Sequence, residues 1–220
     1  MSTAEPVTPF PYPRLNEPAP DFQAVTTQGI RKLSDYRGKW VVFFSHPADF
    51  TPVCSTEFNG FAVRASEFEA RNVQLLGLSI DSVHSHLAWI HDLERIFDTK
   101  IPFPVIADLD MKVATLYGMV HPGLSTTSAV RAVFVIDDKG VLRAMLYYPM
   151  SAGRNISEIL RLVDSLQTTD THGTPTPANW NPGDPVIVPP PANAAEVESE
   201  EAEEAKGYDY KSWYLRYKQV

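Results

Sequence analysis

Residues 40–58 read WVVFFSHPADFTPVCSTEF and contain the chain's single cysteine, Cys54. The run of β-branched and aromatic residues at 41–44 predicts a buried strand. Thr51 and Pro52 then predict the start of a helix, with Thr51 as its N-cap and Pro52 as its first residue. Cys54 would be the third residue of that helix. The sequence therefore places a lone thiol where a strand passes into a helix.

A thiol in the first turn of a helix experiences the positive end of the helix dipole and backbone N–H groups that have no helical partner. Both effects stabilise the thiolate, which is the nucleophilic form of cysteine. The alternative is a buried structural cysteine, the common role of a single intracellular cysteine. The residues that surround Cys54 in the sequence favour the reactive role.

The spacing Pro47-x-x-x-Thr51-x-x-Cys54, preceded by His46 and followed by Glu57, resembles the active-site signature of the peroxiredoxins. The amino-acid sequence from His46 to Cys54 is similar to that of the one-cysteine subfamily in particular. The likeness extends along most of the chain, through the segments Leu78–Ser82, His86–Trp89, Pro102–Pro104, Arg131–Val135, Gly153–Asn155, Trp180–Val188 and Tyr214–Tyr217.

The resemblance implies a role for each residue of the motif. Cys54 would attack the O–O bond of a peroxide, Thr51 would hydrogen-bond the substrate, and Pro47 would shape the pocket. Arg131 matches the arginine that polarises both the thiolate and the peroxide. These roles are physically reasonable because O–O cleavage builds negative charge on the leaving oxygen, which a cation and helix N–H groups stabilise.

The resemblance also implies supporting residues. Glu57, the third residue after the cysteine, would orient Arg131 through a charge-assisted pair. Arg154 resembles a second, supporting cation, and His46 is interpreted as a pocket residue. Arg131 and Glu57 also have simpler alternatives, because an arginine that opens a strand is commonly a surface charge and a glutamate in a first helical turn commonly complements the dipole.

The expected chemistry is reduction of hydrogen peroxide or an alkyl hydroperoxide, which converts Cys54 to a sulfenic acid. No second cysteine can resolve it within the chain, so an external thiol reductant is expected, with no resident cofactor. A rival hypothesis is a redox sensor or oligomeric chaperone that is switched by oxidation of Cys54. A thiol-disulfide oxidoreductase is disfavoured because no Cys-x-x-Cys pair is present.

Composition fits a compact enzyme of 220 residues, of which 44% are hydrophobic. A net charge of −8 opposes nucleic-acid binding, which requires a clustered basic surface. No run approaches the roughly 20 apolar residues of a membrane helix, and residues 1–20 lack the apolar core of a secretory leader. A chain with one cysteine and no such leader predicts a reducing, cytoplasmic location without membrane partners.

The histidines raise the question of a metal site. His84, His86 and His91 lie close together in the sequence, and His46 could join them. His84 and His86 are two residues apart on an expected helix and would face different directions. No Cys-x-x-Cys or His-Glu-x-x-His pattern is present, so no metal is expected.

Proline placement divides the chain into a Pro-rich segment at 1–20, a body at 21–168 and an extension at 169–220. Strand-like and helix-like runs alternate in the body and predict an α/β domain. The expected strands are Val41–Phe44, Val73–Ile80, Ala132–Ile136 and Val141–Tyr148, and the expected helices are Ser55–Glu69, Ser82–Phe97, Ile156–Leu166 and a shorter Lys112–Tyr117. The turn at 137–140 predicts a hairpin. The resemblance narrows this to a thioredoxin-like fold with a central mixed sheet flanked by helices.

The extension is expected to run extended over a surface from Thr168 to Pro191. Six glutamates then fall between Glu196 and Glu204, and a solvated helix face or loop is their expected structure. Five aromatic residues follow: Tyr208, Tyr210, Trp213, Tyr214 and Tyr217. Aromatic residues on a segment too short for its own core must be buried against something. The resemblance implies a dimerisation arm, in a homodimer or higher homo-oligomer.

Overall fold

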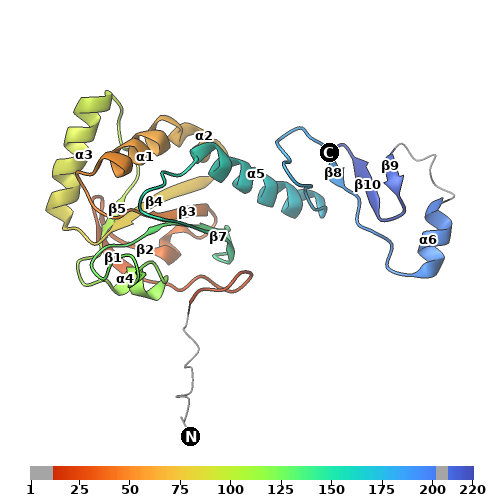
Figure 1. The fold of residues 1–220 in the computed structure, drawn as a ribbon, viewed down its shortest axis with the longest axis horizontal. Helices are drawn as coiled ribbons and strands as arrows, with labels where there is room; N and C mark the ends of the chain where they lie inside the picture. Colours follow the sequence, from red (N-terminus) through yellow and green to blue (C-terminus); the bar gives the residue numbers. More distant parts are fainter. Residues whose placement is uncertain (1–11, 202–207) are drawn as a thin grey trace, which may run out of the picture. The chain divides into compact units, whose positions relative to one another are not determined.

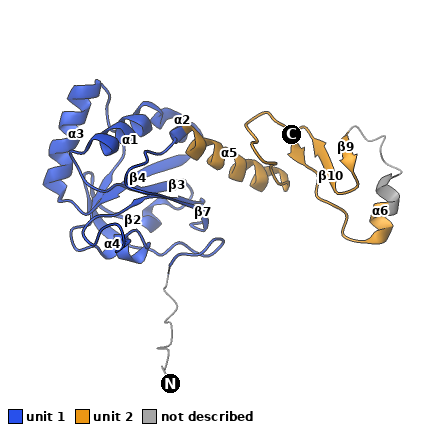
Figure 2. Ribbon diagram, in the orientation of Figure 1, with its two compact units in different colours: residues 1–156 blue, residues 157–220 orange. Residues whose placement is uncertain are grey.

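The structure is a computed structural model that describes residues 12–201 and 208–220. It divides into two compact units, the first ending at Ile156 and the second beginning at Ser157 (Figure 2). This division lies at the start of helix α5 (Ile156–His172), earlier than the boundary expected after residue 168. Most of the expected N-terminal segment, residues 1–11, lies outside the described residues.

The described part of the first unit alternates strands and helices around one sheet (Figure 1). Its elements are β1 (Gln23–Thr26), β2 (Gly29–Lys32), the 3-10 helix η1 (Leu33–Tyr36), β3 (Trp40–Ser45), α1 (Pro52–Val63), α2 (Ala65–Ala70), β4 (Val73–Ser79), α3 (Val83–Phe97), β5 (Val105–Ala107), α4 (Lys112–Leu116), β6 (Arg131–Ile136) and β7 (Leu142–Tyr148).

Among the described residues this sheet has seven strands in the order β2-β1-β5-β4-β3-β6-β7. Strands β3, β4 and β5 are parallel, whereas β6 is antiparallel to β3 and to β7. The predicted mixed sheet is therefore confirmed. The predicted hairpin is confirmed too, because β6 pairs with β7 in antiparallel register across the turn, where Asp137 accepts hydrogen bonds from the backbone of Lys139 and Val141.

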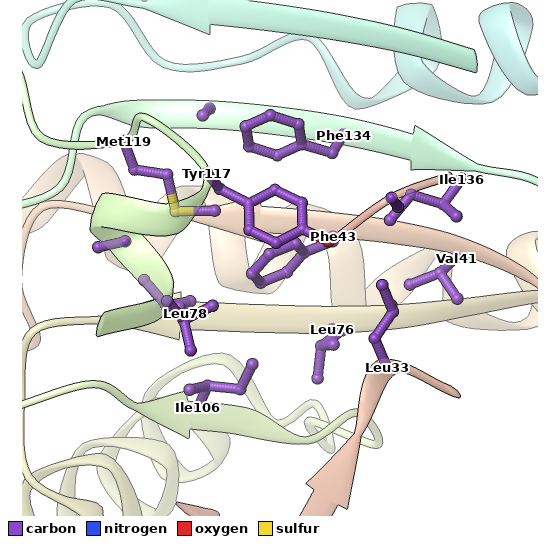
Figure 3. Packing of buried hydrophobic residues seen from close by; sticks show 14 of the residues in the cluster. Leu33, Val41, Phe43, Leu76, Leu78, Ile106, Tyr117, Met119, Phe134 and Ile136 are labelled. Carbon is purple, nitrogen blue, oxygen red and sulfur yellow. The ribbon is translucent and has the colours of Figure 1, made fainter. Parts of the chain in front are cut away.

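Both faces of the central strands are covered, which explains why every residue of β3 is buried. Phe43 packs edge-on against Tyr117, at the end of α4, with ring centroids 5.0 Å apart. Tyr117 in turn contacts Phe134 of β6, as Figure 3 shows. The next residue of β3, Phe44, points to the opposite face and stacks on Phe61 of α1. Strand alternation thus divides the core into two layers.

One predicted helix is two helices. The run expected from Ser55 to Glu69 is broken at Arg64, whose backbone (φ −109°, ψ 8°) leaves the helical region. Its side chain instead pairs with Glu67 at the start of α2. The break separates α1, which carries the cysteine, from α2, which buries Phe68.

The second unit contains more regular structure than its composition predicts. Helix α5 continues six residues past the expected end at Leu166, so the connector begins only after His172. The remaining elements are β8 (Val186–Ile187), α6 (Ala194–Glu201), β9 (Asp209–Ser212) and β10 (Leu215–Lys218), and the strands form a sheet in the order β8-β10-β9. Glu203 and Glu204 of the acidic run lie outside the described residues.

The extension also buries some residues of its own, which the aromatic count did not predict. Trp180 and Val186 are buried, and the indole Nε1 of Trp180 donates a hydrogen bond to the carbonyl of Asp184. The aromatic pair Trp213 and Tyr214 nevertheless remains exposed. In the part of the chain that the structure describes, no helix is both long and apolar enough to traverse a bilayer.

Candidate active site

The cysteine lies where the sequence predicted it. Strand β3 ends at Ser45, Thr51 is the N-cap of α1, and Pro52 is its first residue. The first helical hydrogen bond runs from the backbone N–H of Ser55 to the carbonyl of Thr51. The backbone N–H of Cys54 therefore belongs to the first turn, where N–H groups lack helical acceptors. The Cys54 side chain is fully buried.

Arg131 is the cation beside the thiol. It opens strand β6, which pairs with β3, and its Nη1 lies 3.3 Å from Sγ of Cys54. Its Nε and Nη2 both donate to the carbonyl of Met150, at 2.9 and 2.7 Å. The guanidinium is itself buried and held from two sides. A fixed positive charge thus faces the sulfur.

Glu57 holds this cation, as the resemblance implied. Its Oε2 accepts a hydrogen bond of 2.8 Å from Nη1 of Arg131. Arg154 binds the same carboxylate from its backbone N–H, its Nε and its Nη2, at 2.7 to 2.9 Å. Burial opposes a charge on Glu57, but the hydrogen bonds and positive charges of Arg154 and Arg131 outweigh it and lower the pKa of Glu57.

Arg154 supports the site through Glu57 and through the backbone of the sheet. Its Nη1 donates to the carbonyls of Ser45 and Ala132, at 2.9 and 3.0 Å, and so joins the ends of β3 and β6. Its guanidinium also lies 5.3 Å from the ring centroid of Phe44. The second cation is therefore a clamp that fixes Glu57 against the sheet.

Thr51 differs from the expectation in one respect. It occupies the N-cap position, but its side chain makes no capping hydrogen bond. Its hydroxyl instead donates to the carbonyl of Ala48, at 2.8 Å. This bond closes the turn between β3 and α1, in which Pro47 is half-buried. Because a hydroxyl oxygen keeps lone pairs when it donates, Thr51 can still accept a hydrogen bond from a substrate.

His46 is buried and belongs to a cluster that sequence reasoning missed. Its Nε2 lies 3.0 Å from Oδ1 of Asp49, and Nδ1 of His86 lies 2.9 Å from Oδ2 of the same carboxylate. Burial lowers the pKa of His46, although its hydrogen bond to the Asp49 carboxylate opposes this shift. Asp49 stands inside the quoted motif, but nothing in the sequence indicated that His86, on α3, would reach it.

The same three groups have the spacing of a metal site, since their ligand atoms lie within 4.8 Å of one another. The hydrogen bonds account for this spacing more simply. His86 turns its other ring nitrogen, Nε2, to the carbonyl of Ile106 at 3.0 Å. Both ring nitrogens of His86 and both oxygens of Asp49 are therefore engaged within the protein.

The geometry suits attack by sulfur on an electrophilic oxygen. Arg131 and the first-turn N–H groups of α1 can stabilise a thiolate and the negative charge that develops on a leaving oxygen. Burial strengthens these interactions because the local dielectric is low. Cys54, Arg131, Glu57 and Arg154 form one connected group, whereas Pro47 and Thr51 belong to the adjoining turn.

Comparison with known proteins agrees with this chemistry. Residues 15–145 match the AhpC/TSA family, and residues 165–204 match the C-terminal domain of 1-Cys peroxiredoxin. Peroxiredoxin 2 of Caldanaerobacter subterraneus subsp. tengcongensis is 56% identical, over 94% of this chain and 94% of the relative. A peroxiredoxin of Aquifex aeolicus is 54% identical, over 94% of this chain and 97% of that protein.

Solved structures show the same likeness. A yeast mitochondrial 1-Cys peroxiredoxin superposes with a TM-score of 0.83 at 43% identity, covering 94% of this chain and 99% of the other. Peroxiredoxin 6 of Arenicola marina gives a TM-score of 0.84 at 38% identity, covering 94% and 97%. These matches confirm the thioredoxin-like fold. With its single cysteine and its matched C-terminal domain, the chain belongs to the one-cysteine peroxiredoxins and is a thiol-dependent peroxidase.

Proposed function

We propose that Cys54 is the peroxide-reactive nucleophile and that Arg131, Thr51 and Pro47 form its substrate site. The observation that carries this proposal is the 3.3 Å contact between Nη1 of Arg131 and Sγ of Cys54. Glu57 and Arg154 orient that cation through buried ion pairs. Pro47 and Thr51 complete the site as parts of the turn that precedes the helix.

The first step consumes hydrogen peroxide or an alkyl hydroperoxide. The thiolate of Cys54 attacks the terminal oxygen, so that an S–O bond forms as the O–O bond breaks. The sulfur becomes a sulfenic acid, and the leaving alkoxide or hydroxide takes up a proton to become an alcohol or water. Arg131 stabilises the negative charge on the leaving oxygen because its guanidinium already lies at the sulfur.

The sulfenic acid returns to the thiol through an external reductant. A first thiol condenses with it to a mixed disulfide and releases water. A second thiol then attacks the reductant's sulfur of that disulfide, so that a new disulfide forms between the two reductant thiols and Cys54 leaves as the thiolate. The electrons come from the reductant, so the cycle needs no resident cofactor. The yeast relative is described as using the glutathione and thioredoxin systems. Either kind of thiol requires a reducing setting, and we propose a cytoplasmic one.

We also propose that the C-terminal extension is an assembly arm in a homodimer or higher homo-oligomer. Trp213 and Tyr214 are 41% and 55% exposed at the turn between β9 and β10, with ring centroids 5.4 Å apart. Aromatic residues are enriched at the buried centres of homodimer interfaces. A second copy of the chain would therefore provide the apolar cover that this pair lacks within the described residues.

Steady-state turnover tests the catalytic proposal. Consumption of hydrogen peroxide and of an alkyl hydroperoxide is followed with glutathione, thioredoxin and a small dithiol as alternative donors. Sustained turnover with at least one donor is expected, together with a sulfenic acid on Cys54 detected by mass spectrometry when the donor is omitted. A single equivalent of peroxide consumed with every donor would instead support the redox sensor.

A further inference from the structure

A buried polar cluster lies beneath the turn that carries the substrate residues. His46 directly follows β3, Asp49 lies within the turn that leads to α1, and His86 projects from the first turns of α3. The side chains of both histidines are fully buried, and that of Asp49 is 1% exposed. The Asp49 carboxylate lies between the two rings, 3.0 Å from Nε2 of His46 and 2.9 Å from Nδ1 of His86.

The hydrogen bonds determine where the protons are. Nε2 of His86 faces the carbonyl of Ile106, which only accepts, so that nitrogen carries a proton. Nδ1 of His86 faces both oxygens of Asp49. A lone pair there would repel a carboxylate, so a second proton lies between His86 and Asp49. With Asp49 ionised, His86 is an imidazolium.

Asp49 is the more acidic partner of this shared proton. Burial opposes its charge, but hydrogen bonds from His46 and His86 outweigh it and hold the pKa of Asp49 well below its usual range. His46 stays neutral because burial lowers its pKa. Its one proton then lies on Nε2, facing Asp49, and its buried Nδ1 has no hydrogen-bond partner among the described residues.

The turn between β3 and α1 contains a strained residue and must be held in place by its neighbours. Phe50 has a positive φ of 53°, which is unfavourable for a side chain with a Cβ, and it is exposed. Its neighbour Asp49 is fixed through the backbone as well, because its N–H donates to Oδ2 of Asp81, which also accepts from the hydroxyl of Ser79. The strained residue is followed directly by Thr51.

We propose that Asp49 and His86 are positioning residues for peroxide reduction. They form a buried carboxylate–imidazolium pair that holds the turn from Pro47 to Thr51 and fixes the proton of His46 on Nε2. They touch neither substrate nor sulfur in this role. They act by presenting Thr51 and the start of α1 in the orientation that a peroxide requires. This inference rests on Cys54 being the reacting thiol.

Two reactions of the same thiol separate positioning from general stability. Oxidation of Cys54 by hydrogen peroxide depends on an oriented substrate site, whereas alkylation by iodoacetamide requires only a reachable thiolate. His86→Leu fills the buried space with an apolar side chain and removes the hydrogen bonds of the ring. In this variant the second-order rate constant with peroxide is expected to fall at least tenfold. The alkylation rate is expected to fall less than threefold, or to rise.

His84→Leu is the matched control, because His84 lies on the same helix and is exposed. Both of its rates are expected to equal those of the unchanged protein. If His86→Leu keeps the full peroxide rate, or loses both rates in equal proportion, the positioning role is wrong. If iodoacetamide does not alkylate Cys54 in the unchanged protein, the assignment of Cys54 as the reactive thiol is wrong instead. Failure of the positioning role and failure of the proposed function therefore give different results.

Ring-nitrogen NMR on histidine labelled with ¹⁵N tests the proton assignment without relying on activity. Both ring nitrogens of His86 are expected to carry a proton, as their hydrogen-bond partners require. In Asp49→Asn the amide can accept from His46 and donate to His86, so His86 is expected to lose one ring proton while the fold is kept. Asp49→Asn replaces His86→Leu as the test variant if His86→Leu does not fold. An unprotonated ring nitrogen on His86 in the unchanged protein, or an unchanged signal in Asp49→Asn, would overturn the proposal.

Discussion

Nη1 of Arg131 lies 3.3 Å from Sγ of Cys54, although 77 residues separate them in the sequence. The contact exists because β6 pairs with β3, so that the first residue of β6 meets the helix that follows β3. Glu57, one turn further along that helix, binds the same nitrogen at 2.8 Å. The thiol and the carboxylate thus share one guanidinium group.

Replacing Arg131 with methionine is expected to slow peroxide reduction by about 10²- to 10³-fold, the typical cost of removing one charge-stabilising donor. Methionine keeps much of the apolar volume, but the developing charge on the leaving oxygen loses its cation. The measurement is stopped-flow oxidation of the reduced protein under excess peroxide. Arg95→Met, at an exposed ion pair with Asp92, is the control and should retain the full rate.

Replacing Cys54 with serine is expected to abolish peroxide reduction and leave the fold intact. A serine hydroxyl stays protonated at neutral pH and is a far weaker nucleophile than a thiolate, while its smaller volume fits the same buried place. Peroxide consumption is measured beside a thermal unfolding curve. Substantial residual activity in a folded variant would show that another group reduces the peroxide.

Replacing Thr51 with valine separates substrate binding from turn stability. The hydroxyl bonds the carbonyl of Ala48 and does not cap the helix, so its loss should cost about 1 kcal/mol of unfolding free energy. We expect the peroxide rate to fall by more than this change in stability explains. Thr56→Val is a matched control, because its hydroxyl donates to the carbonyl of Val53 in the same helix. Equal peroxide rates in both variants would leave Thr51 with a structural role only.

The lowered pKa of Glu57 predicts how stability depends on pH. Because the folded pKa lies below the ordinary value of 4.5, the ionised carboxylate stabilises the fold above that value. This stabilisation is lost as the pH falls through the folded pKa. Glu57→Gln leaves Arg131 and Arg154 without their buried anion and should lower the free energy of unfolding by about 3 kcal/mol at pH 7.

The difference in unfolding free energy between Glu57→Gln and the unchanged protein should shrink as the pH falls below 4.5, because the unfolded chain takes up a proton at Glu57 before the native carboxylate does. Denaturant titrations at several pH values measure it. Glu67→Gln is the control, since Glu67 pairs with Arg64 near the surface, where such pairs contribute little. A difference that stays constant down to pH 3 would mean that the charge of Glu57 does not stabilise the fold.

The strand and the helix start that flank Cys54 could be predicted from the sequence. Thr51, Pro52 and Cys54 follow local rules for the start of a helix, and those rules hold without tertiary context. The break at Arg64 and the missing cap bond of Thr51 were not predicted. In each case a partner three residues away, Glu67 for Arg64 and the carbonyl of Ala48 for Thr51, competes with the regular helical or capping arrangement, and the sequence alone does not decide between them.

Polar contacts between residues distant in the sequence could not be predicted either. His86 was weighed as a neighbour of His84, but its real partner is Asp49, 37 residues away. A buried polar side chain whose partner is distant in the sequence has no distinct sequence pattern. The short strands of the second unit, such as β8 at Val186–Ile187, were missed because two residues carry no measurable alternation.

Replacing Trp213 and Tyr214 together with serine tests the assembly arm without shortening the chain. Both rings are exposed, so their loss should leave the extension folded, while an interface built on them would lose its apolar centre. Sedimentation at several concentrations should show weaker self-association. Ile30→Ser, which removes an exposed apolar residue from β2, should associate like the unchanged protein. If the double variant keeps the same mass and affinity, these rings do not form the interface between copies.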